Sequence, residues 1–158
     1  MSNLVRDLEV GLTELRRLTS ADFAALAWQD HDSIIRWKCA SGNRSNRYKR
    51  ILLRFERGIA GSVIRTVRPV MINNFSPEIK ENACEYPILL AEDLKSAIGV
   101  PVKINEQVMG VLLVGCRVNR EFDRDTVELI GSVAEQLGSM LQQNDPIIKV
   151  VFNGGLRD

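Results

Sequence analysis

Two helix-period stripes of apolar residues stand near opposite ends of this 158-residue chain and enclose segments with the pattern of strands. The first stripe comprises Leu4, Leu8, Leu12, Leu15 and Leu18, and charged residues lie between its members. The second stripe follows Asp123, an acceptable N-cap, and comprises Val127, Ile130, Ala134, Leu137 and Leu141. This spacing predicts an amphipathic helix at each end. Because each helix has a single apolar face, both are expected to pack on one face of a sheet in an α+β layer fold.

Short apolar runs between turn residues predict a central antiparallel sheet with one inserted helix. The expected strands span residues 23–28, 34–40, 51–55, 70–72, 97–103 and 108–117. The inserted helix is expected over residues 59–66, between Gly58 and Pro69, and residues 73–87 form a long connection with about one helical turn. Residues 1–145 are expected to form one domain, followed by a C-terminal extension over residues 146–158 that is either an added strand or a tail.

Composition excludes several classes of function. A net charge of +1 argues against a general nucleic-acid binder, and no apolar run approaches the roughly 18 residues of a membrane span. Three cysteines without close pairing, and no visible signal peptide, fit a cytoplasmic protein with free thiols. His31 is the single histidine of the chain, which makes a histidine-based metal site very unfavourable.

The stretch Gly-Ile-Ala-Gly at positions 58–61 opens the inserted helix and favours a small-ligand site over a catalytic centre. The first N–H groups of a helix have no intrahelical acceptor and carry a partial positive charge, so they can bind an anion. Trp37 can donate one further hydrogen bond through its indole N–H. The simpler interpretation is also open, because glycine turns before helices are common and Trp37 can be a plain core residue.

Three segments together resemble the GAF domain family: "RGIAGSVIRTVRPVMINN", "LKSAIGVPVKINEQVMGVLLVG" and "FDRDTVELIGSVAEQLGSML". They correspond to the glycine turn with its inserted helix, the central strand pair and the closing helix. The resemblance covers almost the whole chain. It implies a single GAF domain, with the N- and C-terminal helices on one face of a central antiparallel sheet and a ligand pocket on the other.

Within that family the chain resembles the stand-alone nitrate receptors. The resemblance implies a non-catalytic cytoplasmic nitrate sensor, without a cofactor, that modulates an oxygen-sensing histidine kinase of a two-component system controlling nitrate respiration. It also implies the residues that contact nitrate: Trp37, Leu53, Ile59, Ala60, Tyr86, Pro87 and Ile88.

Three alternatives within the GAF family stay open. Free methionine-R-sulfoxide reductases use cysteines around the same pocket, and Cys84 and Cys116 lie in loosely comparable regions, but Ala60 stands where that family has a cysteine. A cyclic-nucleotide receptor would need a larger cavity and a base-recognising edge. A homodimer through the two terminal helices is expected, either as the sole role or alongside nitrate binding.

Residues 44–57 carry a run of cations: Arg44, Arg47, Lys49, Arg50, Arg54 and Arg57. Such a run can steer anions towards a site or meet an acidic partner, and it can equally be a solvated face. Tyr48 is the only aromatic residue among the first four cations, so a stacking platform for single-stranded nucleic acid has no support.

Overall fold

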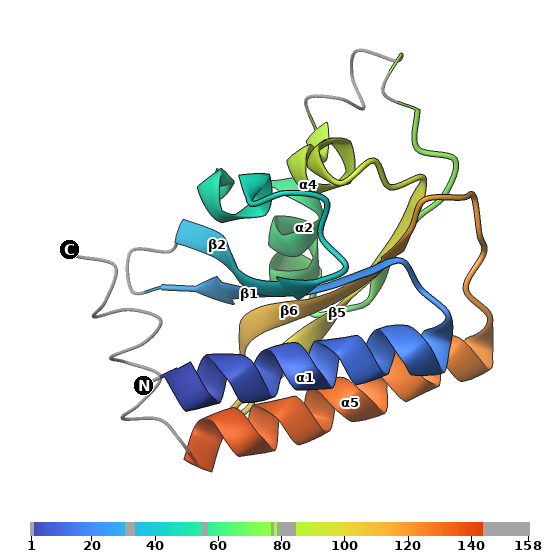
Figure 1. The fold of residues 1–158 in the computed structure, drawn as a ribbon. Coiled ribbons are helices and arrows are strands. Elements are labelled where there is room, and N and C mark those ends of the chain that lie inside the picture. Colours follow the sequence, from blue (N-terminus) through green and yellow to red (C-terminus); the bar gives the residue numbers. More distant parts are fainter. Residues whose placement is uncertain (1, 31–33, 55–56, 77, 79–84, 144–158) are drawn as a thin grey trace.

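The chain forms a six-stranded antiparallel sheet with helices on both faces (Figure 1). The computed structural model describes residues 2–30, 34–54, 57–76, 78 and 85–143. The helices are α1 (Ser2–Thr19), the 3-10 helix η1 (Arg47–Arg50), α2 (Gly58–Thr66), α4 (Pro87–Ala91) and α5 (Arg124–Gln143). The strands are β1 (Phe23–Gln29), β2 (Ile34–Ser41), β3 (Leu52–Arg54), β4 (Val70–Ile72), β5 (Ser96–Ile104) and β6 (Gln107–Cys116).

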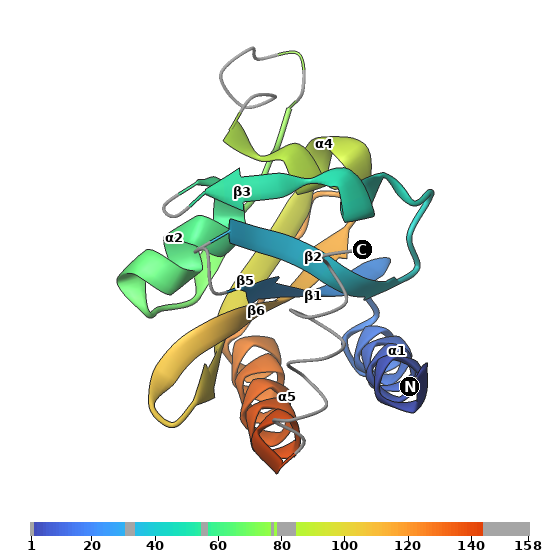
Figure 2. The same ribbon diagram turned by 90° about the vertical axis from the view of Figure 1, so that its left-hand side faces the viewer.

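The strands lie in the order β3-β2-β1-β6-β5-β4 (Figure 2). In the central pair, Phe23 to Trp28 of β1 lie opposite Gly115 to Gly110 of β6. Both faces of this pair are covered, so β1 is buried at almost every position and reads as a continuous apolar run rather than as an alternating one. Strands β3 and β4, of three residues each, form the two edges.

Helices α1 and α5 lie side by side across one face of the sheet (Figures 1 and 2). The first stripe buries Leu4, Leu8, Leu12 and Leu15 against the sheet, and α5 contributes Ile130, Ala134 and Leu141. Alternate residues of the central strands, such as Leu26 and Leu112, complete this core. Leu18 differs from expectation: it is 48% exposed, and Thr19, four residues after Leu15, takes the next buried position of the helix instead.

The opposite face is covered by α2, α4 and η1 (Figure 1). The intervening positions of the central strands point to this side, including Phe23 and Ala25 of β1 and Val111 and Leu113 of β6. The molecule therefore has two buried clusters separated by one sheet.

The α+β architecture expected from the sequence is confirmed, with terminal helices on one face and shorter helices on the other. Two details differ from expectation. In addition to the one inserted helix that was expected, the segment between β2 and β3 contains η1, in which Tyr48 is 4% exposed. The expected third strand, residues 51–55, is shorter among the described residues, where only Leu52–Arg54 pair with β2.

The C-terminal extension lies outside the described residues, and the boundary drawn at residue 145 stays a prediction. Among the helices of the described ranges, none combines the length and the apolar character needed to cross a membrane.

Candidate ligand-binding site

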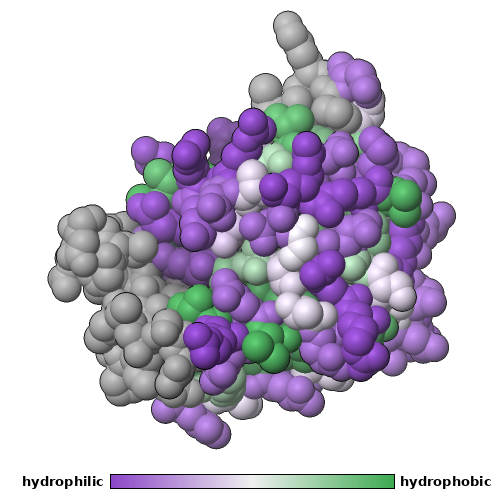
Figure 3. All heavy atoms as spheres, in the orientation of Figure 1, coloured by the Kyte–Doolittle hydropathy of each residue, from purple (hydrophilic) through white to green (hydrophobic). Residues whose placement is uncertain are grey.

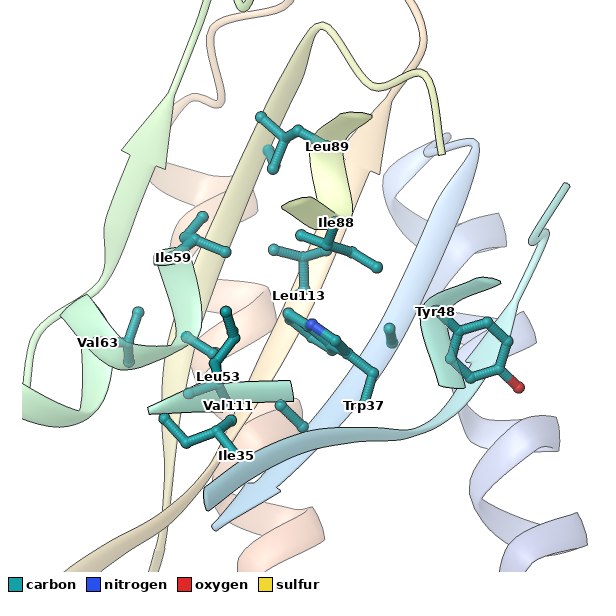
Figure 4. Close-up of a cluster of buried hydrophobic side chains, with 14 of the residues drawn as sticks. Ile35, Trp37, Tyr48, Leu53, Ile59, Val63, Ile88, Leu89, Val111 and Leu113 are labelled. Atoms are coloured by element: carbon teal, nitrogen blue, oxygen red, sulfur yellow. The ribbon is translucent and has the colours of Figure 1, made fainter. Parts of the chain in front are cut away.

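The cluster under α2, α4 and η1 brings together residues that are far apart in the sequence. Five of the seven expected ligand-binding residues are buried members of it: Trp37, Leu53, Ile59, Ala60 and Ile88. Tyr86 is partly buried and packs against the cluster, and Pro87 is the first residue of α4. The expected residues thus come from β2, β3, α2 and the start of α4 (Figure 4). We refer to Trp37 and the first turns of α2 and α4 around it as the candidate site.

Trp37 is the most informative residue of the candidate site. It occupies an inward position of β2 and is only 2% exposed. Its ring lies among Leu53, Ile88 and Leu113, with the nitrogen facing into the cluster (Figure 4). Among the described residues, its buried indole Nε1 has no hydrogen-bond partner. Burying an unsatisfied donor costs about 1–3 kcal/mol. A small acceptor bound here would remove that cost, and none of the described residues supplies one.

The start of α2 supplies further donors next to Leu53. The first intrahelical bond runs from the N–H of Gly61 to the carbonyl of Arg57 at 2.9 Å, so the N–H groups before Gly61 have no acceptor within the helix. The N-cap residue, Arg57, offers no side-chain cap. Ile59 and Ala60 are 1% and 0% exposed, so their N–H groups belong to a buried helix start with a partial positive charge.

Gly58 sets the approach to this helix start. Its φ of 66° lies in the left-handed region, which glycine adopts without strain. A Cβ at this position would stand 3.0 Å from Cδ1 of Leu53. Glycine therefore meets two requirements. It allows the positive φ with which the backbone turns into α2, and it lets the backbone lie directly against the side chain of Leu53.

The short helix α4 closes the cluster from the side opposite α2. Pro87 occupies its first turn, where the missing N–H costs nothing, and the first helical bonds reach back to the carbonyl of Tyr86. The Tyr86 ring packs edge-on against Phe75 with centroids 6.3 Å apart. Burial raises the pKa of the Tyr86 phenol and also that of Tyr48, so both side chains stay neutral near pH 7.

The donors of the candidate site suit a small hydrogen-bond acceptor. It offers N–H donors without a full counter-charge, surrounded by apolar side chains that exclude water and strengthen each hydrogen bond. A doubly charged anion would be buried there with too few partners. A singly charged, weakly hydrated anion fits these donors best.

The described cysteines do not serve this site. Cys39 and Cys116 are buried in the other cluster, under α1 and α5. Burial raises the pKa of Cys39 to about 12, so its thiol stays protonated and unreactive at neutral pH. At the helix start the structure places Ala60, which has no thiol, and Cys84 lies outside the described residues.

A buried ion pair that the sequence did not indicate anchors the end of α4. Glu92 follows α4 directly and is 0% exposed. Its Oε1 accepts hydrogen bonds from Arg117 at 2.8 Å and from the backbone N–H of Arg44 at 2.7 Å. Arg117 also donates to the carbonyls of Glu92 and Gly42, at 2.9 and 3.1 Å. The end of α4 is therefore held to Arg117, which directly follows β6, and to the loop after β2.

We expect Glu92→Gln to lower the free energy of unfolding by about 1 kcal/mol. Glutamine keeps an acceptor oxygen but removes the charge that balances Arg117, whose side chain is partly exposed. Urea unfolding of the variant would measure the loss. Asp93→Asn is the matched control, because Asp93 is exposed and pairs with Arg44 only at 3.9 Å, and asparagine also tolerates the φ of 55° at this position. It should change stability by less than about 0.5 kcal/mol. Equal effects of the two substitutions would contradict an anchoring role for Glu92.

Two cavities lie on the other side of the sheet, and neither is lined by any of the seven expected residues. One, of about 200 Å³, lies between α1 and α5 and is lined by apolar residues such as Leu12, Leu15 and Leu137. The other, of about 720 Å³, lies beside β5 and α5 and includes Lys103 and Gln142. Neither cavity therefore gives the candidate site the additional volume that a nucleotide would need.

Comparison with known proteins agrees with the geometry. The family model of the GAF domain matches residues 8–142. Two structures of a mutated NreA protein in its nitrate binding site, from Staphylococcus aureus, are 35% and 37% identical to the chain, with TM-scores of 0.69 and 0.68. They align over 81% and 78% of this chain and over 96% and 97% of their own. No curated protein gives a significant match.

A type II free methionine-R-sulfoxide reductase from Thermoplasma acidophilum has the same fold. It is 12% identical, with a TM-score of 0.70, and the alignment covers 87% of this chain and 91% of the reductase. At this identity the likeness extends to the fold alone.

Proposed function

This chain belongs to the GAF domain family, and within that frame we propose that it is a receptor that binds nitrate at the candidate site and has no catalytic activity. The observation that carries the proposal is the buried indole N–H of Trp37, which has no partner among the described residues and lies in the same buried cluster as the start of α2. The similarity to NreA supports it, because NreA has a nitrate binding site and is 35–37% identical to this chain.

Nitrate matches the candidate site in charge and shape. It is planar, singly charged and weakly hydrated, so neutral N–H donors suffice to replace its water. In the proposed complex, Trp37 and the N–H groups of Ile59 and Ala60 donate to its oxygens, and the first turn of α4 closes over it with Tyr86, Pro87 and Ile88. Leu53 supplies an apolar wall next to Gly58.

The proposed output is a change in the affinity for a sensor histidine kinase of a two-component system that controls nitrate respiration. A ligand shifts such an equilibrium only by its differential affinity for two states, and α4 with its Glu92 anchor is the element that nitrate would hold in one of them. A homodimer through α1 and α5 is part of the same proposal, since Val10 on α1 is 63% exposed and Leu18 is 48% exposed.

Thermal unfolding against a panel of anions and alternative ligands tests the proposal. Nitrate at about 100 times its dissociation constant should stabilise the protein by about 2.7 kcal/mol. For a chain of this size that raises the melting temperature by roughly 5–10 °C. Chloride and sulfate should give no comparable shift. A shift with cyclic GMP alone, or turnover of free methionine sulfoxide, would contradict nitrate as the ligand.

A further inference from the structure

The outer surface of η1, β3 and the start of α2 concentrates positive charge. All six cations of residues 44–57 are exposed: Arg44, Arg47, Lys49, Arg50, Arg54 and Arg57. Glu56 is the only acidic residue in this stretch, and the whole chain has a net charge of +1, so the remainder of the protein is net negative. Figure 3 shows the surface around η1 as predominantly hydrophilic. We call these six residues the basic surface.

Within the part of the chain that the structure describes, most of the basic surface has no acidic partner. Arg44 forms one exposed ion pair with Asp93 at 3.9 Å, and Lys49 lies 5.9 Å from the ring centre of Tyr48. Among the described residues, no ion pair involves the guanidinium groups of Arg47, Arg50, Arg54 and Arg57. Surface cations in folded proteins are usually interspersed with acids. These guanidinium groups form no ion pair with any described acidic residue, so they are available to an external anion.

The basic surface also has an apolar centre and an open backbone edge. Strand β3 pairs only with β2 and forms one edge of the sheet (Figure 2). Leu52, in this strand, is 55% exposed between the flanking cations, whereas the next residue, Leu53, points inward to the candidate site. An extended segment with both acidic and apolar side chains would satisfy all three features.

We propose that the basic surface is the docking surface for an acidic, leucine-containing segment of a partner protein. Among the described residues the arrangement disfavours nucleic acid, because stacking needs exposed aromatic rings and Tyr48, the aromatic residue described among the cations, is 4% exposed. The surface lies on the back of the candidate site: Leu52 contacts the partner on one face of β3, while Leu53 lies against Gly58 on the other. A docked segment therefore rests on the same strand that forms a wall of the site.

A fluorescein-labelled dodecapeptide of four Glu-Glu-Leu repeats is a suitable probe of the full-length protein, read by fluorescence anisotropy. Binding is expected in low salt and should weaken when ionic strength is raised several-fold, because exposed ion pairs are screened. The double variant Arg50→Ala, Arg54→Ala should weaken binding by about five- to tenfold. Leu52→Ser should weaken it further without changing the net charge.

The matched control removes two exposed cations elsewhere, Arg6→Ala with Lys103→Ala, and should change the affinity by less than about twofold. Equal losses in both double variants would mean that only net charge matters and would overturn the proposal. So would no binding by the wild-type protein in low salt, or tighter binding of a twelve-nucleotide thymidine strand than of the peptide. Trp37→Phe should leave peptide binding unchanged, so a failure of nitrate binding and a failure of docking give different results.

Discussion

Replacing Trp37 with phenylalanine is expected to weaken nitrate binding about 10- to 100-fold while the protein stays folded. Phenylalanine keeps most of the ring that packs among Leu53, Ile88 and Leu113 but lacks the N–H (Figure 4). A hydrogen bond to a charged group contributes about 1.5–3 kcal/mol, and each 1.4 kcal/mol is a factor of ten in affinity. Calorimetric titration with nitrate would measure the change directly.

The same substitution makes a second prediction for the protein without nitrate. Without nitrate, the buried Trp37 N–H has no partner among the described residues, which lowers the free energy of unfolding. Removing it should therefore offset part of the stability lost with the packing of the indole. The melting temperature without nitrate should therefore stay close to that of the wild type, while the shift produced by nitrate shrinks. Loss of a packing residue alone would instead lower the melting temperature and leave the nitrate shift intact.

Trp28→Phe is the control for this experiment. Trp28 is equally buried, at 2% exposed, but it lies in the cluster under α1 and α5. Nitrate should bind this variant as it binds the wild type. If Trp37→Phe binds nitrate with wild-type affinity, the anion does not contact the indole and the assignment of the candidate site is wrong.

The layers of the fold could be predicted from the sequence, because apolar residues follow a different spacing in the helices than in the strands. The stripe from Leu4 to Leu15 repeats every three or four residues and is buried on one side of α1. The central strands are apolar at nearly every position because both sheet faces are covered, which fits a buried strand better than an exposed hairpin. Gly58 indicated the start of α2 in the sequence. The structure explains why glycine stands there, because φ is positive at this position.

The features that the sequence did not reveal depend on contacts between distant residues. Glu92 and Arg117 form the buried pair that anchors α4, yet they are 25 residues apart and neither stands in a recognisable motif. Tyr48 looked like a loop residue among cations, and its burial makes η1 part of the second cluster. The sequence indicated that Trp37 has a donor to offer, but only the packing of β2, β3 and α4 around it leaves that donor without a partner.

A Gly138→Ala substitution is expected to lower the free energy of unfolding by about 3 kcal/mol, in spite of the better helix propensity of alanine. Gly138 is buried in α5 where the helix crosses β5. A Cβ there would stand 2.4 Å from the carbonyl oxygen of Lys103. This oxygen belongs to the backbone of a strand paired with β6, so it cannot turn aside as a side chain would. Overpacking of this kind costs about 1–3 kcal/mol or more, and the clash with backbone puts it at the upper end.

Gly131→Ala, about two turns earlier in α5, separates this steric effect from helix propensity. A Cβ at position 131 has no neighbour within 4 Å, so the substitution should stabilise the protein by up to about 1 kcal/mol. In thermal unfolding the two variants should therefore move in opposite directions, Gly138→Ala downwards by roughly 6–12 °C and Gly131→Ala upwards by roughly 2–4 °C. Stabilisation by both would show that α5 does not approach β5 at Lys103 as closely as described. The two glycines share one helix, so a difference in intrinsic helix propensity could not explain stabilisation by both substitutions. The packing of α5 on the sheet would then need revision.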